Sequence, residues 1–227
     1  MRQLLLDLDA HQAPSLETFV IGQNAELAQV LSLFADSKAS QYGERSVYLW
    51  GEAGAGKTHL LHALAQSAQA RYIPANAPPS HFDYDPSCNL YLLDDCELLE
   101  PAAQIDAFAL FNEVRAEGGF FVAAGTRPPM ILNLREDLRT RLGWGLIYQV
   151  HGLSDEEKIA ALEASAQSRG ISLAVGVLPY LITHYRRDMR SLTELIDELD
   201  HLSLETKRPI TLPLLRELLQ EKNYLPT

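Results

Sequence analysis

The chain has 227 residues, of which 47% are hydrophobic and 22% charged, a profile typical of a globular protein with one large or two small domains. Its formal net charge of -11 argues against a protein whose main task is to grip DNA or an anionic membrane. No apolar run approaches the length of a membrane span, and the N-terminus lacks signal-peptide architecture, so we expect a cytoplasmic protein without a membrane partner. Cys88 and Cys96 have no metal-ligand spacing; we expect reduced thiols, with a disulfide between them left open.

The first two thirds of the chain alternate between predicted strands and helices. Residues 1–15 have the composition of a tail, and a helix is expected over residues 24–35 with Asn24 as its N-cap. Apolar segments typical of strands buried on both faces of a sheet then alternate with helical patterns. The predicted strands are residues 46–50, 71–74, 89–93, 120–124 and 146–150, and the predicted helices are 58–69 and 103–117. This alternation predicts a parallel sheet with helices on both sides.

The strand signal stops after Gly152. Ser154 begins a helix with a capping-box pattern and acidic residues in the first turn. Further helices are expected over residues 175–186, 189–205 and 213–222. The predicted organisation is therefore a tail over residues 1–15, an α/β domain over 16–152 and a helical domain over 153–227.

Residues 51–58, GEAGAGKT, match the complete phosphate-binding loop pattern G-x-x-x-x-G-K-[ST]. Its glycines let several backbone N–H groups point into one concavity, and the N-terminus of the following helix favours negative charge. Lys57 can reach the outer phosphates, and the Thr58 hydroxyl can ligate Mg²⁺. The pattern therefore predicts a nucleotide as cofactor. The candidate contacts along this segment are Glu52, Ala53, Gly54, Ala55, Gly56, Lys57, Thr58 and His59.

Polar residues follow two of the apolar strands. Ligands of open parallel sheets bind beyond the carboxyl ends of the strands. We therefore predict that Asp94 holds the Mg²⁺ water shell and that Asp95 polarises or activates water. Thr126 could reach the γ-phosphate or the attacking water. The alternatives are an acidic turn after the first strand and a turn-capping threonine after the second.

Three arginines are candidates for contact with a nucleotide. Arg139 and Arg141 lie on one predicted helix, and either could be an arginine finger for a phosphate bound by a neighbouring protein. Arg190 begins a helix of the second domain and could fold over the nucleotide as a lid contact. The alternative for each is a solvated surface arginine.

The tail contains the segment Gln3-Leu4-Leu5-Leu6-Asp7-Leu8. In an extended peptide Leu4, Leu6 and Leu8 point to one face, and Gln3 offers an amide to a polar pocket. Linear peptides dock in grooves on partner proteins in this way. The alternatives are an added edge strand of this domain or a disordered end.

Taken together, these residues resemble the AAA+ ATPase superfamily, in the branch of the bacterial replication initiator DnaA. The resemblance implies an AAA+ P-loop core with a five-stranded parallel sheet flanked by helices, plus a C-terminal all-α lid domain. It assigns the segment near the adenine to Val20 and Ile21, Walker A to residues 51–58, Walker B to Asp94 and Asp95, sensor 1 to Thr126, the arginine finger to Arg141 and not Arg139, and sensor 2 to Arg190. Two departures stand out: Thr126 replaces an acidic residue, and Asp95 stands where many relatives have Glu.

The tail, of form Q-L-x-L-x-L, resembles a sliding-clamp-binding motif, and no residues remain after Thr227 for the DNA-binding domain with which DnaA ends. This combination resembles the Hda family, which inactivates DnaA. The resemblance implies a protein that binds ADP or ATP with Mg²⁺ and docks on the DNA-loaded sliding clamp, the beta subunit of DNA polymerase III. It would then stimulate hydrolysis of DnaA-bound ATP through Arg141 in trans, with weak ATPase activity of its own.

Two alternatives stay open: a helicase loader of the DnaC type and a stand-alone ATPase. The acidic charge and the clamp-like tail argue against strong direct DNA binding. The sequence leaves homo-oligomer formation open.

Overall fold

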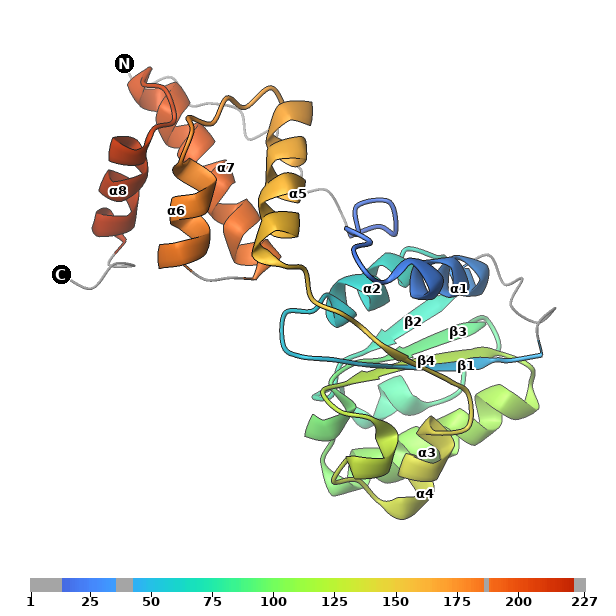
Figure 1. Ribbon diagram of the computed structural model, residues 1–227. Helices are drawn as coiled ribbons and strands as arrows, with labels where there is room; N and C mark the ends of the chain where they lie inside the picture. Colours follow the sequence, from blue (N-terminus) through green and yellow to red (C-terminus); the bar gives the residue numbers. More distant parts are fainter. Residues whose placement is uncertain (1–13, 36–42, 186–187, 223–227) are drawn as a thin grey trace. The chain divides into compact units, whose positions relative to one another are not determined.

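The computed structural model describes residues 14–35, 43–185 and 188–222 (Figure 1). The chain divides after Gly152 into two compact units. No helix among the described residues combines the length and apolar character that a bilayer-spanning segment requires.

The first unit is built on a five-stranded parallel sheet, as the alternation of strands and helices predicts. Its strands are β1 (Ser46–Trp50), β2 (Ala70–Ile73), β3 (Leu90–Leu93), β4 (Phe120–Gly125) and β5 (Leu146–Gln149), in the order β2-β3-β4-β1-β5. The register pairs Trp50 with Gly125 and Leu93 with Ala123, so the carboxyl ends of β1, β4 and β3 meet at one edge. The predicted α/β fold class is confirmed.

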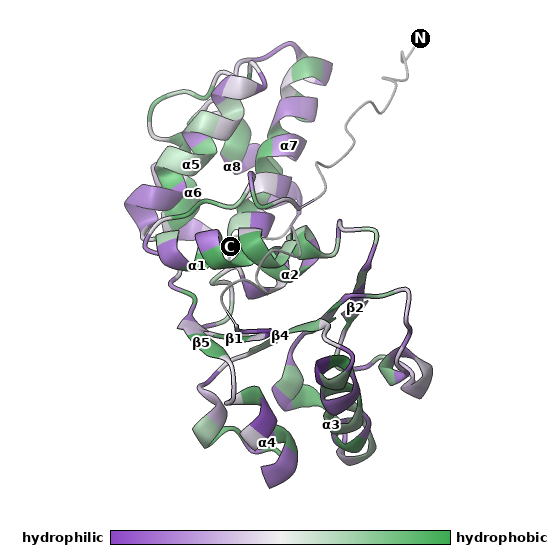
Figure 2. Cartoon of the chain, turned by 90° about the vertical axis from the view of Figure 1, so that its right-hand side faces the viewer, coloured by the Kyte–Doolittle hydropathy of each residue, from purple (hydrophilic) through white to green (hydrophobic). Residues whose placement is uncertain are grey.

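Helices cover both faces of this sheet (Figures 1 and 2). One core cluster joins α1 (Ala25–Ala35) and α2 (Lys57–Leu64) to the sheet, through leucines such as Leu31 and Leu60. The other cluster joins α3 (Pro101–Ala116) and α4 (Glu136–Leu142) to the opposite face, through residues such as Phe111 and Leu138. Burial on both faces explains why β1, β3 and β4 are almost continuously apolar.

Two local predictions are wrong in detail. Helix α2 ends at Leu64, five residues before the predicted end. The backbone N–H groups of Gln66 and Ser67 donate to carbonyls three residues back, which forms a tight turn that leads into β2. Asn24 does precede α1, but its side-chain amide does not cap that helix. It is 3% exposed and instead exchanges two hydrogen bonds of 2.9 and 2.8 Å with the backbone of His151. Three short 3₁₀ turns, η2 (Pro79–Phe82), η3 (Cys96–Leu98) and η4 (Pro129–Ile131), were not predicted.

The described residues of the second unit form the helices α5 (Asp155–Ser168), α6 (Val177–His184), α7 (Met189–Thr206) and α8 (Leu212–Glu221). The predicted capping box is present: the Ser154 hydroxyl accepts from the Glu157 N–H, and the Glu157 carboxylate accepts from the Ser154 N–H. Leucine-rich faces of all four helices form a separate core. This unit is therefore the all-helical domain expected from the sequence.

Candidate functional site

The phosphate loop connects β1 to α2, and its backbone requires glycine at three positions. Gly54 and Gly56 have φ angles of 79° and 102°, in the left-handed region that glycine adopts most readily. A Cβ at Gly56 would lie 2.9 Å from the Phe19 ring, and a Cβ at Gly51 would lie 2.4 Å from the Val150 carbonyl oxygen. The close approach of Phe19 and Val150 thus fixes a tight backbone cradle at the start of α2, as phosphate binding requires.

Lys57 is only 6% exposed and lies across this loop. Its ammonium group donates to the carbonyl oxygens of Gly51 and Glu52 at 2.8 and 2.9 Å. An ammonium group has three donors, so one N–H remains for a phosphate oxygen. The cradle and its buried cation therefore fit a polyphosphate chain. Ala53 lies in the turn that follows β1, Ala55 is buried, and Thr58 is exposed.

Asp94 follows β3 and is 1% exposed. Its Oδ2 accepts a 2.8 Å hydrogen bond from the Tyr72 hydroxyl, and its Oδ1 accepts one of 2.9 Å from the Asp95 N–H. The Tyr72 ring in turn stacks on His62, with ring centroids 4.3 Å apart. Burial and the bond to Asp94 raise the pKa of Tyr72 above its usual range. The carboxylate is thus held in one orientation, as a ligand for the Mg²⁺ water shell needs to be.

Asp95 has φ and ψ of 46°, a left-handed conformation that is uncommon for a residue other than glycine. Burial raises the pKa of its carboxyl group, Asp94 and Glu97 raise it further, and Lys57 opposes them. Lys57 is therefore close enough to act on Asp95, so the phosphate loop and the two acids share one edge of the sheet. Strained backbone of this kind is common at functional sites.

Thr126 follows β4 at the same edge, and its side chain is exposed. The preceding Gly125 leaves room for Tyr48, because a Cβ there would lie 2.2 Å from the Tyr48 hydroxyl. That hydroxyl donates to the Arg127 carbonyl at 2.9 Å and so ties the segment after β4 to β1. Both cysteines are free, and burial raises the pKa of the Cys96 thiol to about 12. Cys96 is therefore an unreactive core residue.

Sequence reasoning did not identify Tyr48 and Tyr72 as site residues. Both lie next to apolar residues in short strands, where pattern alone does not distinguish them from core residues. Only the order of the strands shows that the Tyr72 hydroxyl reaches Asp94 from the neighbouring strand.

The predicted adenine segment lies against the phosphate loop. Val20 and Ile21 are 36% and 47% exposed, apolar, and directly follow Phe19, which packs on Gly56. His59 Nε2 lies 3.3 Å from the Ser15 carbonyl oxygen, and burial lowers the pKa of this imidazole. His59 therefore fastens the N-terminal segment to α2, a role that the sequence did not suggest.

Arg141 lies in the last turn of α4, half-buried among residues of its own unit. Its Nε donates to Asn112 Oδ1 at 2.8 Å, and its guanidinium carbon lies 3.7 Å from the centre of the Trp144 ring. Among the residues that the structure describes, Arg141 forms no ion pair, and its Nη atoms donate no hydrogen bond. Arg139, two residues earlier on the same helix, forms no side-chain hydrogen bond or ion pair within the described ranges.

Two family models match parts of the chain. The model described as "Hda, lid domain" matches residues 155–219, and the model of the bacterial DnaA ATPase domain matches residues 11–76. The chain is an AAA+ protein related to Hda and DnaA.

Solved AAA+ structures share this fold. Domain III of the replication initiation protein DnaA from Thermotoga maritima superposes with a TM-score of 0.75 at 20% identity, over 94% of this chain and 97% of that one. DnaA from Aquifex aeolicus, in an AMPPCP-bound structure, gives a TM-score of 0.67 at 23% identity, over 86% and 68% of the two chains. The RuvB Holliday junction branch migration motor of Thermotoga maritima gives 0.63 at 18% identity, over 87% and 68%.

For this AAA+ protein, the structure brings one group of predicted site residues together within the first unit. Lys57, Asp94, Asp95 and Thr126 lie at the carboxyl edge of the sheet. Arg190 belongs to the helical unit, where its 88%-exposed side chain forms a 2.9 Å ion pair with Glu194 in the first turns of α7. The predicted clamp-binding residues lie outside the described residues; they are Gln3, Leu4, Leu6 and Leu8.

Proposed function

We propose that this protein is a regulator of replication initiation that, while bound to nucleotide and to the DNA-loaded sliding clamp, stimulates hydrolysis of the ATP held by DnaA. Arg141 is the arginine finger supplied in trans. In this proposal the protein acts mainly on its partner's nucleotide, and its own site serves to hold the regulator in an active conformation.

The observation that carries this proposal is the environment of Arg141. Its guanidinium group is steadied by a neutral amide and an aromatic face, so its full charge is available to an external anion. The segment that follows Arg141 also returns to the end of β1 opposite the phosphate loop. Gly145 packs against Ser46 at the amino end of β1, whereas the loop follows the carboxyl end, and a five-residue strand is roughly 13 Å long, from four rises of about 3.3 Å. This placement favours action on a second molecule.

The nucleotide at this chain's own site is an adenine nucleotide, ADP or ATP, with Mg²⁺. The AMPPCP-bound structure of the related DnaA supports this choice, and so do the apolar side chains of Val20 and Ile21 beside the loop. Lys57 and the loop amides would bind phosphates, Thr58 and Asp94 would hold the metal ion, and Arg190 would complete the site. Mg²⁺, when bound, would neutralise phosphate charge. Asp95 and Thr126 are the residues proposed to orient water for any hydrolysis at this site.

The decisive experiment is an ATPase assay with DnaA, DNA-loaded clamp and this protein, each omitted in turn. Arg141→Ala should abolish stimulation of DnaA while leaving folding and ADP binding intact, and an arginine finger is worth about 10³–10⁵-fold in rate. Arg139→Ala is the matched control and should stimulate normally, because Arg139 lies on the same helix and forms no side-chain hydrogen bond or ion pair among the described residues. Full stimulation by Arg141→Ala would disprove the finger.

Clamp binding is tested separately. Replacing Leu4, Leu6 and Leu8 with alanine, or deleting residues 3–8, should abolish capture of this protein by immobilised clamp, since these apolar side chains are proposed to fill the groove. Leu5→Ala is the control, because in an extended peptide Leu5 points to the other face. Capture that survives the triple replacement would remove the clamp from the proposal.

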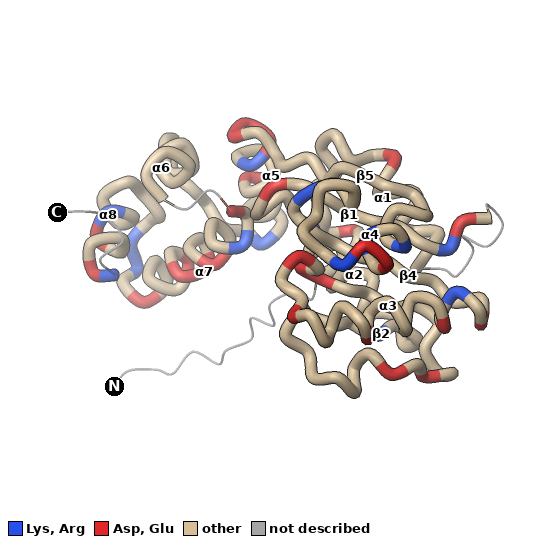
Figure 3. The backbone as a smooth tube through the Cα atoms, turned by 90° about the horizontal axis from the view of Figure 1, so that it is seen from below, with Lys and Arg blue, Asp and Glu red and all other residues tan. Residues whose placement is uncertain are grey.

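The complete phosphate loop and acid pair also keep the stand-alone ATPase and the DnaC-like helicase loader as second candidates. Both would hydrolyse ATP without DnaA, and a loader would also bind single-stranded DNA. The charge distribution favours the regulator: in the view of Figure 3, Lys and Arg are interspersed with Asp and Glu along both units. Salt-dependent DNA affinity near micromolar, or fast hydrolysis without DnaA, would favour these alternatives.

A further inference from the structure

Trp144 is the one residue of the α4–β5 connection that contacts two guanidinium groups. The guanidinium carbon of Arg141 lies 3.7 Å from the centre of its ring, and that of Arg115 lies 5.1 Å from it. Trp144 is nevertheless 47% exposed, although tryptophan is highly buried on average. Neither arginine has a carboxylate partner among the described residues, so the aromatic ring is what both cations share.

The surrounding backbone holds the indole in this place. Gly145 follows Trp144 and packs so closely on β1 that a Cβ there would lie 2.1 Å from the Ser46 carbonyl oxygen. The N–H of Trp144 also donates to the Arg141 carbonyl at 3.1 Å, at the end of α4. The residue is therefore fixed on both sides, by β1 and by the helix that carries Arg141.

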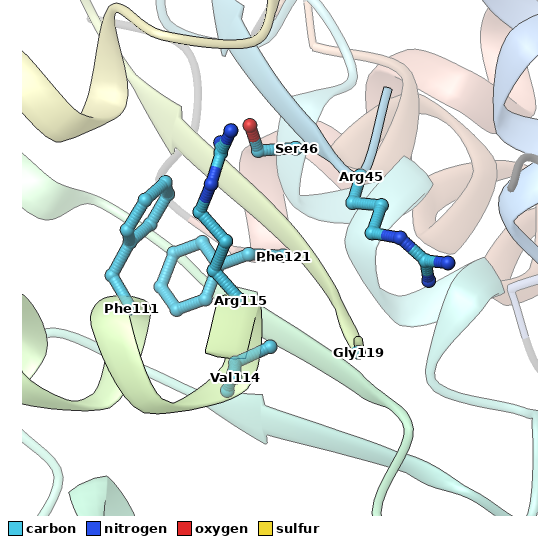
Figure 4. A pocket seen from close by; sticks show the side chains of 7 residues that line it. All are labelled: Arg45, Ser46, Phe111, Val114, Arg115, Gly119 and Phe121. Atoms are coloured by element: carbon cyan, nitrogen blue, oxygen red, sulfur yellow. The ribbon is translucent and has the colours of Figure 1, made fainter. Parts of the chain in front are cut away.

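Arg115 contacts the Trp144 ring from a different helix, α3. It lies in the last turn of α3, and its stem lines a small pocket with Phe111, Val114 and Phe121. Figure 4 shows this side chain extending from α3 past Phe121 toward Ser46, the residue on which Gly145 packs. Residues of α3 and α4 thus contact the same indole, and β1 packs on the glycine that follows it.

We propose that Trp144 is the positioning residue of the finger, which presents the Arg141 guanidinium to the partner's phosphates, and that Arg115 braces the indole from α3. An arginine side chain has many rotamers, and most of them would leave the guanidinium out of place when a partner docks. A stacked ring restricts these rotamers without neutralising the charge, whereas a carboxylate partner would compete with the phosphate. The inference rests on the proposed function, because it assigns a role to the residue that supports Arg141.

The activity test uses the DnaA ATPase assay described above and compares Trp144→Phe with Trp144→Leu. The energy of a cation–π contact corresponds to about a 2- to 30-fold loss in the maximal stimulated rate for Trp144→Leu, with a smaller loss for Trp144→Phe, which keeps an aromatic face. The concentration that gives half-maximal stimulation should stay unchanged, because the indole acts on the orientation of Arg141 and not on docking. Arg45→Gln is the control: it removes another arginine–aromatic contact, to Phe120 at 5.3 Å, and should stimulate normally.

The outcomes separate the inference from the proposed function. If Arg141→Ala abolishes stimulation but Trp144→Leu does not lower it, or changes only the half-maximal concentration, Trp144 is not a positioning residue. If Arg141→Ala itself stimulates normally, the proposed function of Arg141 as an arginine finger is wrong, whatever the Trp144 variants do. Thermal unfolding of each variant shows whether the domain is intact, and Trp144→Phe remains interpretable should Trp144→Leu unfold.

A second test needs no partner. In a Trp50→Phe background, Trp144 is the only tryptophan of the chain, so its fluorescence reports on this contact alone. Acrylamide quenching of that fluorescence should rise in Arg141→Ala, because the guanidinium group no longer covers the ring, and should stay unchanged in Arg139→Ala. Equal quenching in both variants would show that Arg141 does not stack on Trp144 in solution.

Discussion

Two tyrosines of this protein each donate a hydrogen bond to a carboxylate, and they differ mainly in burial. The Tyr72 hydroxyl donates to Asp94 at 2.8 Å, and Asp94 is 1% exposed. The Tyr148 hydroxyl donates to Glu26 at 2.9 Å, and both partners lie at the surface. Burial raises the pKa of both phenols, and so does the bond to the carboxylate. Tyr72→Phe and Tyr148→Phe therefore remove the same chemical group from two different environments.

The expected costs follow from that difference. A hydrogen bond to a buried charged group contributes about 1.5–3 kcal/mol, because its loss leaves the charge undersolvated, so Tyr72→Phe should lower the free energy of unfolding of the first unit by about that amount. The exposed pair contributes about 0–1 kcal/mol, because water replaces the lost bond. For domains of this size, 1 kcal/mol shifts the melting temperature by about 2–4 °C. We therefore expect a fall of about 3–12 °C for Tyr72→Phe and of less than about 4 °C for Tyr148→Phe.

Thermal unfolding followed by circular dichroism measures both shifts under the same conditions. Equal shifts would refute the reasoning that burial of Asp94 sets the strength of this bond. Nucleotide binding provides a second readout, since Tyr72 fixes the orientation of the proposed Mg²⁺ ligand. Tyr72→Phe should weaken binding in the presence of Mg²⁺ and leave binding in excess EDTA unchanged. An equal loss in both buffers would mean that Tyr72 supports the loop and not the metal site.

Three further substitutions test other features of the structure. Asn24→Ala removes two hydrogen bonds to the His151 backbone and should lower the free energy of unfolding of the first unit by about 2 kcal/mol, measured by chemical denaturation. Replacing the exposed neighbour Gln23 with alanine should leave it nearly unchanged, and similar losses for both would contradict the assigned pairing. Ser154→Ala removes the capping box and should cost the helical unit about 1 kcal/mol, detectable as an earlier unfolding transition of that unit. Asp95→Asn should stabilise the protein at pH values above the raised pKa of Asp95, because the folded state disfavours the charged carboxylate. The gain should disappear near pH 4 and below, where the wild-type carboxyl group is neutral in both the folded and the unfolded state. A gain that does not depend on pH would show that charge is not its cause.

The local patterns of the sequence predicted the elements of this fold and the phosphate loop. Strands buried on both faces must be almost entirely apolar, and a loop that curls around phosphates needs glycine at fixed spacing, so both leave a signature in consecutive residues. The same is true of the capping box at Ser154, whose two partners are three residues apart. The end of α2 was predicted less well, because the turn into β2 depends on where the next strand must begin.

The chain alone therefore determined the element types, the sheet class and the glycine-rich loop that we propose binds phosphate. The tertiary structure decided which side chains support them: Tyr72 reaches Asp94 across 22 positions, Arg141 reaches Asn112 across 29, and Asn24 reaches His151 across 127. These partners depend on strand order and register, because β2 lies beside β3 and the segment after β5 returns to the start of α1. A pattern of neighbouring residues contains no information on such pairings, since burial and closeness arise only when the sheet is assembled.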